Sequence, residues 1–330
     1  MVLGMGLKWS LMMRERFDVV GVGLNATDTL LLVPRFPAFA GKEPFTGEIV
    51  SVGGQVASAV VACQRLGLRT KYVGTVGDDE RGSLQMESLR EAGVDVADVE
   101  VRAGCATQSA YIVIDGTTGE RTVLWRREDG LALRTEDVAG RWIDGARMVH
   151  LDGHDTPAKE QVARMARERG IPVSCDVDTV YDGFERVLPN VDYLVASSNF
   201  PPEWTGEADR FAALRKIQGE YGMKLAAMTL GVQGALAFSD GRFVYSPGFA
   251  VDCVDTTGAG DAFHGAFCFG ALREWPLERS LEFANAVAAL NSTALGARGN
   301  LASREDAEQL IASGTRVRDA DCESGITSNR

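Results

Sequence analysis

The chain has 330 residues, of which 45% are apolar and 24% charged. These values are ordinary for a globular protein and allow one large α/β domain or two small ones. Its formal net charge of −12 argues against a nucleic-acid or anionic-membrane partner, which would have to approach against a repulsive field. An anionic small ligand would need a local binding device that overcomes this charge.

The N-terminal residues and the cysteines indicate the cellular location of the protein. MVLGMGLKWSLMMRERF contains a lysine and is followed by no small-residue cleavage site, so we reject a signal peptide and expect residues 1–16 to form an N-terminal extension. No apolar run is long enough to span a bilayer. The six cysteines are scattered without CxxC pairs or metal-ligand spacing, which predicts free thiols and a cytoplasmic protein.

Short Val-rich runs alternate with helical patterns along most of the chain. This alternation predicts a mostly parallel sheet covered by helices on both faces, within a single domain over residues 17–314. The expected strands are 17–23, 71–76, 146–152, 171–177, 191–197 and 224–230, and the expected helices are 56–67, 82–93, 157–170 and 209–222.

Two segments lack the helical period. Residues 29–52 contain no helical pattern, and residues 105–126 read as a β-hairpin around the turn DGTTGE. Such strands would project from the main sheet as a small β layer, forming a lid, a dimer contact or both. The tail after about Gly314 has almost no apolar residues, so we expect residues 315–330 to be disordered.

Three small residues, Gly258, Ala259 and Gly260, precede Asp261 at the start of a predicted helix. Their amides and the positive end of the helix dipole would make an anion site without a basic side chain. A carboxylate beside such a site suits phosphoryl transfer, in which a base accepts the proton of the acceptor hydroxyl. The simpler alternative is that Asp261 only caps the helix.

VDTTGAGDAFHGAF (254–267) resembles the C-terminal signature of the PfkB (ribokinase-like) family of carbohydrate kinases. The segment SVGGQVASAVVACQRLGLRTKYVGTVGDDERG (51–82) resembles the N-terminal signature of the same family. The segment TLGVQG (229–234) resembles its nucleotide-binding turn. The resemblance implies a Rossmann-like α/β core with a small β-sheet lid that is often the homodimer contact. It also implies ATP- and Mg²⁺-dependent phosphorylation of a sugar or nucleoside hydroxyl.

The resemblance assigns roles to individual residues. Asp261 corresponds to the catalytic base, with the amides of Gly258, Ala259 and Gly260 as the anion hole. The implied acceptor-binding residues are Asp28, Gly53, Gly54, Gln55 and Ser58. The implied ATP-binding residues are Ser197, Thr229, Gly231, Gly234, Asn285 and Gly299. Some relatives bind a monovalent cation such as K⁺ where Asp255 and Thr257 stand here.

Two positions depart from the family pattern. Ser58 stands where asparagine is common, which implies a larger or wetter pocket. The family's Asn-x-x-Glu element is lost, because its positions carry Ser197 and Phe200. Ketohexokinase-like members share this loss, and Mg²⁺ would then be held mostly by ATP phosphates and water. A ketohexose or related furanose is therefore the favoured acceptor, while a pentose, a nucleoside, a sugar acid and a sugar phosphate remain open.

Other interpretations were weighed. GVGLNA (21–26) nearly matches a dinucleotide fingerprint, but no helical pattern follows it, and no P-loop motif occurs. HLDGHD (150–155) invites a metal site without support for three or four ligands. His264 is expected to be a packed helix residue. Lys42, Arg126 and Arg127 could meet an acidic tail of the substrate, but the favoured expectation is that they are solvated charges of the lid. A catalytically silent sugar-binding protein is the alternative from another class, and the intact GAGD sequence argues against it.

Overall fold

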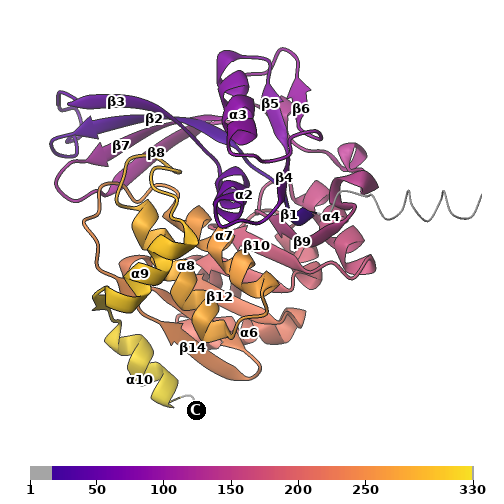
Figure 1. Ribbon diagram of the computed structural model, residues 1–330, viewed down its shortest axis with the longest axis vertical. Helices are drawn as coiled ribbons and strands as arrows, with labels where there is room; N and C mark the ends of the chain where they lie inside the picture. The colour runs from indigo at the N-terminus through magenta and orange to yellow at the C-terminus, as the bar shows by residue number, and fades with distance from the viewer. Residues whose placement is uncertain (1–16, 329–330) are drawn as a thin grey trace, which may run out of the picture.

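The structure is a computed structural model that describes residues 17–328 (Figure 1). The expected N-terminal extension, residues 1–16, lies outside the described residues. An α/β core and a smaller sheet projecting from it make up the described chain. No helix in this part of the chain is long and apolar enough to cross a membrane.

Eight strands form the central sheet in the order β14-β13-β12-β11-β10-β9-β1-β4. Neighbouring strands are parallel from β4 to β12, and β13 and β14 add an antiparallel edge. The expected mostly parallel sheet is thus confirmed. The strands are β1 (Phe17–Val22), β4 (Thr70–Val73), β9 (Ala146–Leu151), β10 (Val173–Val177), β11 (Tyr193–Ser197), β12 (Leu225–Thr229), β13 (Ala235–Ser239) and β14 (Arg242–Ser246).

Helices cover both faces of this sheet because successive strand side chains point to opposite sides. Met148 of β9 packs into one hydrophobic cluster, and Val149 and Leu151 pack into the other. The first face carries α2 (Gln55–Arg65), α7 (Ala259–Leu272) and α8 (Leu277–Asn291), and the second carries α4 (Thr156–Glu168) and α6 (Arg210–Tyr221). The remaining helices are α3 (Glu80–Glu91), α5 (Phe200–Thr205), α9 (Arg304–Ser313) and α10 (Ala320–Ser328).

The smaller sheet has the order β3-β2-β7-β8 and extends away from the core (Figure 1). Its strands are β2 (Ala26–Val33), β3 (Gly47–Gly53), β7 (Ser109–Asp115) and β8 (Arg121–Arg126). The extra β layer expected from residues 29–52 and 105–126 is therefore present. On one face Leu30, Ile112 and Ile114 form a small buried cluster against Leu295, which follows α8. This contact brings the sheet close to the start of α7.

Two expectations were wrong. The run at 71–76 is not one strand: the chain turns at Gly74, and β5 (Thr75–Gly77) pairs with β6 (Glu100–Arg102) outside the central sheet. A side chain at Gly74 would collide with the Tyr72 hydroxyl, 2.2 Å from its Cβ.

The predicted disorder of residues 315–330 is contradicted over its described part. There β16 (Arg316–Val317) pairs with β15 (Gly248–Phe249), and α10 follows. The segment is anchored by a fully buried Cys322 and by an ion pair of 2.9 Å between Arg210 and Asp319. A few well-placed contacts hold a segment whose apolar content is low.

Candidate active site

Two distant parts of the chain meet at Ala297. A Cβ atom at Gly258, which precedes α7, would lie 2.1 Å from the carbonyl oxygen of Ala297. A Cβ at Gly53, at the end of β3, would lie 3.1 Å from the Ala297 side chain and 2.6 Å from the carboxylate of Asp28. Glycine is required at both positions by close approach. The GAGD loop and the predicted acceptor residues therefore border one site.

The GAGD loop is fixed by buried polar contacts. Gly258 has φ 73° and is the N-cap of α7, a conformation that favours glycine. The buried carboxylate of Asp255 accepts hydrogen bonds from the amide and hydroxyl of Thr257 and from the amide of Gly296. The amide of Ala259 donates to Thr256 at 3.3 Å, so we look to the Gly258 and Gly260 amides for the anion hole.

Asp261 lies in the first turn of α7. Burial, reinforced by the nearby Asp176 carboxylate, raises its pKa to about 7, while His264, Arg121 and Arg298 act in the opposite direction. A carboxylate whose pKa lies near neutrality is suited to proton transfer at that pH. The structure thus gives Asp261 the environment of a base, which a helix cap does not require.

His264, one turn later, is buried as expected, and it also lies against a carboxylate. Its Nε2 lies 3.1 Å from the carboxylate of Asp176 on β10. Burial alone would lower the pKa of His264, and Asp176 outweighs burial and raises it. Sequence reasoning missed Asp176, although a carboxylate inside the apolar run IPVSCDV was a usable signal.

Asp28 lies on β2 and is 5% exposed. Burial raises its pKa to about 6, although the guanidinium groups of Arg298 and Arg81 oppose this. The side-chain oxygens of Gln55 and Gln108 are buried with no hydrogen-bond partner in the structure. Unpaired acceptors of this kind fit hydroxyl donors of a polyhydroxylated ligand.

Arg298 was not predicted. Its Nε donates to the Ser58 hydroxyl at 3.4 Å, its Nη1 to the Ser88 hydroxyl at 3.2 Å, and its Nη2 to the Gly53 carbonyl at 3.3 Å. Burial lowers its pKa to about 10 although Asp261 and Asp28 favour the charged form. The signal in the sequence was a single arginine within the small-residue stretch ALGARGN.

The predicted nucleotide-binding residues lie at several points of the sheet. Ser197 ends β11 and Thr229 ends β12, at the edge where ligands bind in open α/β sheets. Gly231 and Gly234 flank the turn before β13, with φ values of 58° and 101°.

Asn285 and Gly299, which are predicted to lie near the adenine of ATP, both have close contacts within the protein. The side-chain nitrogen of Asn285 donates to Ser246, at 3.0 Å from its carbonyl and from its hydroxyl. Gly299 lies in the turn after α8, where a Cβ would approach the Leu295 carbonyl to 2.3 Å. Phe200, at a lost family position, is fully buried and stacks on Trp204.

Residues 17–328 contain no group of three or more His, Cys, Asp or Glu side chains placed to hold a metal ion. In the HLDGHD segment, Asp152 pairs with Lys159 at 2.5 Å, and Asp155 pairs with Arg127 at 2.6 Å. Arg127 is therefore largely buried in an ion pair, not solvated as expected. Neither carboxylate is free to act as a metal ligand without losing its partner.

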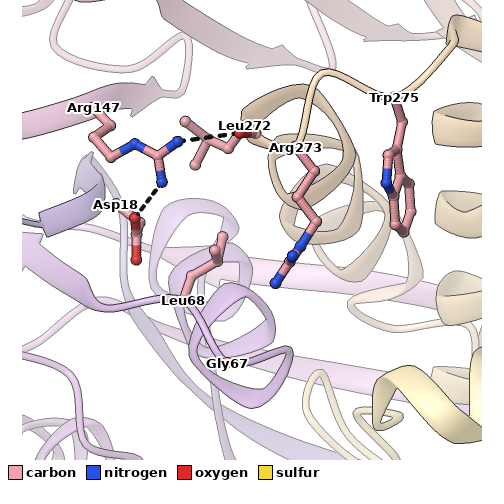
Figure 2. Close-up of a pocket in the computed structure, with 7 residues that line it drawn as sticks. All are labelled: Asp18, Gly67, Leu68, Arg147, Leu272, Arg273 and Trp275. Atoms are coloured by element: carbon pink, nitrogen blue, oxygen red, sulfur yellow. Dashed lines mark hydrogen bonds and ion pairs between the residues drawn. The ribbon is translucent and has the colours of Figure 1, made fainter.

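A hollow of about 450 Å³ lies at the opposite end of the sheet (Figure 2). It is lined near the amino ends of β1 and β9, where Arg147 bridges Asp18 and the carbonyl of Leu272. Arg273 and Trp275 complete its wall. None of the predicted site residues borders this hollow, so the converging side chains at Ala297, not the size of the cavity, locate the candidate site.

Comparison with known proteins shows the family to which the chain belongs. Residues 45–304 match the family model described as pfkB family carbohydrate kinase. The ATP-dependent ribose-1-phosphate kinase of Halopiger xanaduensis is 31% identical over 85% of this chain and 93% of its own length. Fructokinase-1 of Zea mays is 27% identical over 78% of this chain and 88% of its own length.

Solved structures show the same fold. The Arabidopsis thaliana ribokinase complexed with ribose and ATP superposes with a TM-score of 0.75 at 23% identity, covering 91% of this chain and all of that one. A structure from E. coli in complex with ATP and Mg²⁺ gives a TM-score of 0.78 at 22% identity, covering 90% of this chain and 99% of that one.

Proposed function

Since the chain belongs to the PfkB family of carbohydrate kinases, we propose that it transfers the γ-phosphoryl group of ATP to a sugar hydroxyl, with Asp261 as the general base. The observation that carries this proposal is the Asp261 carboxyl in the first turn of α7, beside a glycine loop and with a pKa of about 7. Both parts of a phosphoryl-transfer site, a base and amides for the developing charge, are then adjacent.

In the proposed reaction the acceptor hydroxyl faces Asp261 and attacks the γ-phosphorus as its proton passes to the carboxylate. The bond between the γ-phosphorus and the β–γ bridging oxygen breaks, and ADP leaves. The amides of Gly258 and Gly260, at the positive end of the α7 dipole, stabilise charge on the transferred group. Asp28 accepts hydrogen bonds from other hydroxyls of the sugar and so orients the sugar for the reaction. Gly53, Gly54, Gln55 and Ser58 border the same pocket.

For the nucleotide, we propose the edge formed by Ser197, Thr229, Gly231 and Gly234, with Asn285 and Gly299 supporting the adenine end. Mg²⁺ would be held mainly by phosphate oxygens and water, as it often is in kinases. The Asp255 side chain is occupied by three donors, so a K⁺ ion near Thr257 would depend on backbone carbonyls.

Family membership alone does not select the acceptor, because the named relatives act on pentoses, hexoses and a sugar phosphate. A ketohexose or related furanose is one candidate, and a nucleoside or sugar acid is another. The test is ATP consumption with Mg²⁺ and a panel of sugars, sugar phosphates, sugar acids and nucleosides. Acceptor-dependent turnover is expected; binding without any turnover would instead support a silent sugar-binding protein.

The smaller sheet is proposed to be both the lid of the acceptor pocket and the contact of a homodimer. Three consecutive apolar residues of β8 are exposed, with Leu124 and Trp125 each 62% exposed. Such a patch on a surface strand suits an interface. Light scattering should give a dimer at micromolar concentration, and Trp125→Glu should yield monomers; a wild-type monomer would contradict the pairing.

The free cysteines of the described chain support the proposed cytoplasmic location.

A further inference from the structure

Two arginines on the acceptor side of the site lack a carboxylate partner within the described chain. Arg298 contacts only the neutral oxygens of Ser58, Ser88 and Gly53, at 3.2–3.4 Å. Arg81, on α3, donates to the Thr27 carbonyl at 3.4 Å. By contrast, the nearby Arg127 forms a 2.6 Å ion pair with Asp155.

These contacts are poor compensation for a desolvated guanidinium group. Arginine stays charged in proteins, and a buried charge is costly unless it is paired and hydrogen-bonded. Three of the five N–H donors of Arg298 are engaged, all at long distances, and two remain. Guanidinium donors in this arrangement match the oxygens of a phosphate or carboxylate group.

Basic side chains gather on this side of the pocket. Arg81, Arg298 and Arg121 all lower the pKa of Asp28, and the carboxylates of Asp28 and Asp261 both act on Arg298. Three arginines thus lie close together in a chain whose net charge is −12. The two that lack a carboxylate hydrogen-bond partner, Arg298 and Arg81, are the local device that an anionic ligand of such a protein requires.

We propose that the acceptor is an anionic sugar, and that Arg298, assisted by Arg81, binds its phosphate or carboxylate group while the reacting hydroxyl faces Asp261. This inference rests on the proposed function and narrows it. Ser58 is part of the arrangement, because its short side chain leaves room for the guanidinium group that it contacts. Arg298 is thus a specificity-determining residue.

The first test compares wild-type kcat/KM for matched pairs: ribose with ribose 1-phosphate and ribose 5-phosphate, fructose with its 1- and 6-phosphates, and glucose with gluconate. The kcat/KM of the anionic member of at least one pair should exceed that of its neutral parent by about tenfold or more, the size expected of a charge-assisted hydrogen bond. Neutral sugars that equal or exceed their anionic counterparts in every pair would overturn the inference and leave the kinase proposal intact. No turnover with any acceptor would instead refute the kinase proposal.

The second test uses Arg298→Met, with Arg164→Met as the matched control on the exposed side of α4. Arg298→Met should raise KM for the preferred anionic acceptor by about 10- to 100-fold, the range expected for a charge-assisted hydrogen bond, and change KM for the neutral parent little. An equal loss for both acceptors, or a fall in kcat alone, would assign Arg298 to the transferred phosphoryl group and overturn the inference.

Stability gives a readout independent of turnover. Replacing a partly buried charge that lacks an ionic partner by an apolar side chain of similar length removes the cost of desolvating that charge. The Tm of ligand-free Arg298→Met should therefore equal or exceed that of the wild type, whereas a structural role predicts a lower Tm. If Arg298→Met fails to fold, its role is structural and the specificity assignment falls; Arg81→Met and the wild-type pairs then decide whether the acceptor is anionic.

Discussion

Carboxylates with little access to solvent occur in two regions near the carboxyl ends of the central strands, and their pKa values are shifted in opposite directions in the two regions. After β9, burial alone would raise the pKa of Asp152, but Lys159, His154 and the Leu24 amide outweigh burial and lower it. In the candidate site, burial prevails and raises the pKa values of Asp28 and Asp261 to about 6 and about 7. Compensation by a close cation accounts for the difference.

The contrast distinguishes a carboxylate that stabilises the fold, Asp152, from the two that are candidates for binding and catalysis, Asp28 and Asp261. The Asp152–Lys159 pair is fully buried, and Asp152 also accepts the amide of Leu24 at 2.6 Å, so it fixes the loop between β1 and β2. Asp28 and Asp261 form no ion pair within the described chain, and they stay available to a ligand. Perturbed but unpaired groups are typical of functional sites. The following predictions test whether this division holds.

The largest effect is expected for Asp261→Asn, which keeps the shape of the side chain but removes the base. The value of kcat should fall by about 10²- to 10⁴-fold, the usual contribution of general-base catalysis. KM for the acceptor should change little, because the amide still hydrogen-bonds the hydroxyl. Steady-state kinetics with saturating ATP measures both.

The control for this prediction is Asp28→Asn. A residue that orients hydroxyls in the ground state mainly affects KM, since it stabilises bound sugar and transition state alike. Near wild-type kcat in Asp261→Asn would reduce Asp261 to a helix cap and refute the proposed mechanism.

For the ion pair between Asp152 and Lys159, the variant Lys159→Met should lower the free energy of unfolding by about 3–5 kcal/mol, because it leaves Asp152 buried without its cation. Urea unfolding measures this loss. Asp28→Asn is the comparison, since Asp28 has no ion pair to break and its removal should cost much less. Equal losses in the two variants would show that the two regions do not differ in kind.

The sequence predicted a mostly parallel sheet flanked by helices and an additional small β layer, because hydrophobic period and turn residues are local signals. It failed at Gly74, where the strand breaks and the nearby Tyr72 hydroxyl leaves no room for a side chain. It also failed for the tail, because the ion pair between Arg210 and Asp319 joins residues far apart in the chain. Long-range polar partners leave no periodic pattern.

The same reason explains which site residues were missed. Asp176 and Arg298 reach the site from β10 and from the turn after α8. Their role depends on proximity to Asp261, which only the folded chain shows. Ser58 was predicted from its place in a motif, but its partner Arg298 is 240 residues away. Motifs predicted Asp261 and the glycine loop as candidates, and packing shows the charges around them.

The last prediction concerns pH and is the smallest in size. With a neutral acceptor, which does not itself titrate, kcat/KM should fall about tenfold per pH unit below the pKa of the base. For Asp261 this limb should lie near pH 7, since its pKa is about 7. Arg298→Met should move the limb to higher pH because Arg298 lowers that pKa, and Arg164→Met should leave it in place.

Stability must vary in the opposite sense to activity. A carboxyl group whose folded pKa is raised contributes stability that is fully present below its unfolded pKa, about 4, and is lost as pH rises through the folded value. The wild type should therefore lose stability between about pH 4 and pH 7 as Asp261 ionises, and Asp261→Asn should lose less. Tm measured across this range in both proteins tests the sign. A limb near pH 4 together with identical Tm profiles would place Asp261 in an ordinary solvated environment, and the contrast with Asp152 would then have no chemical meaning.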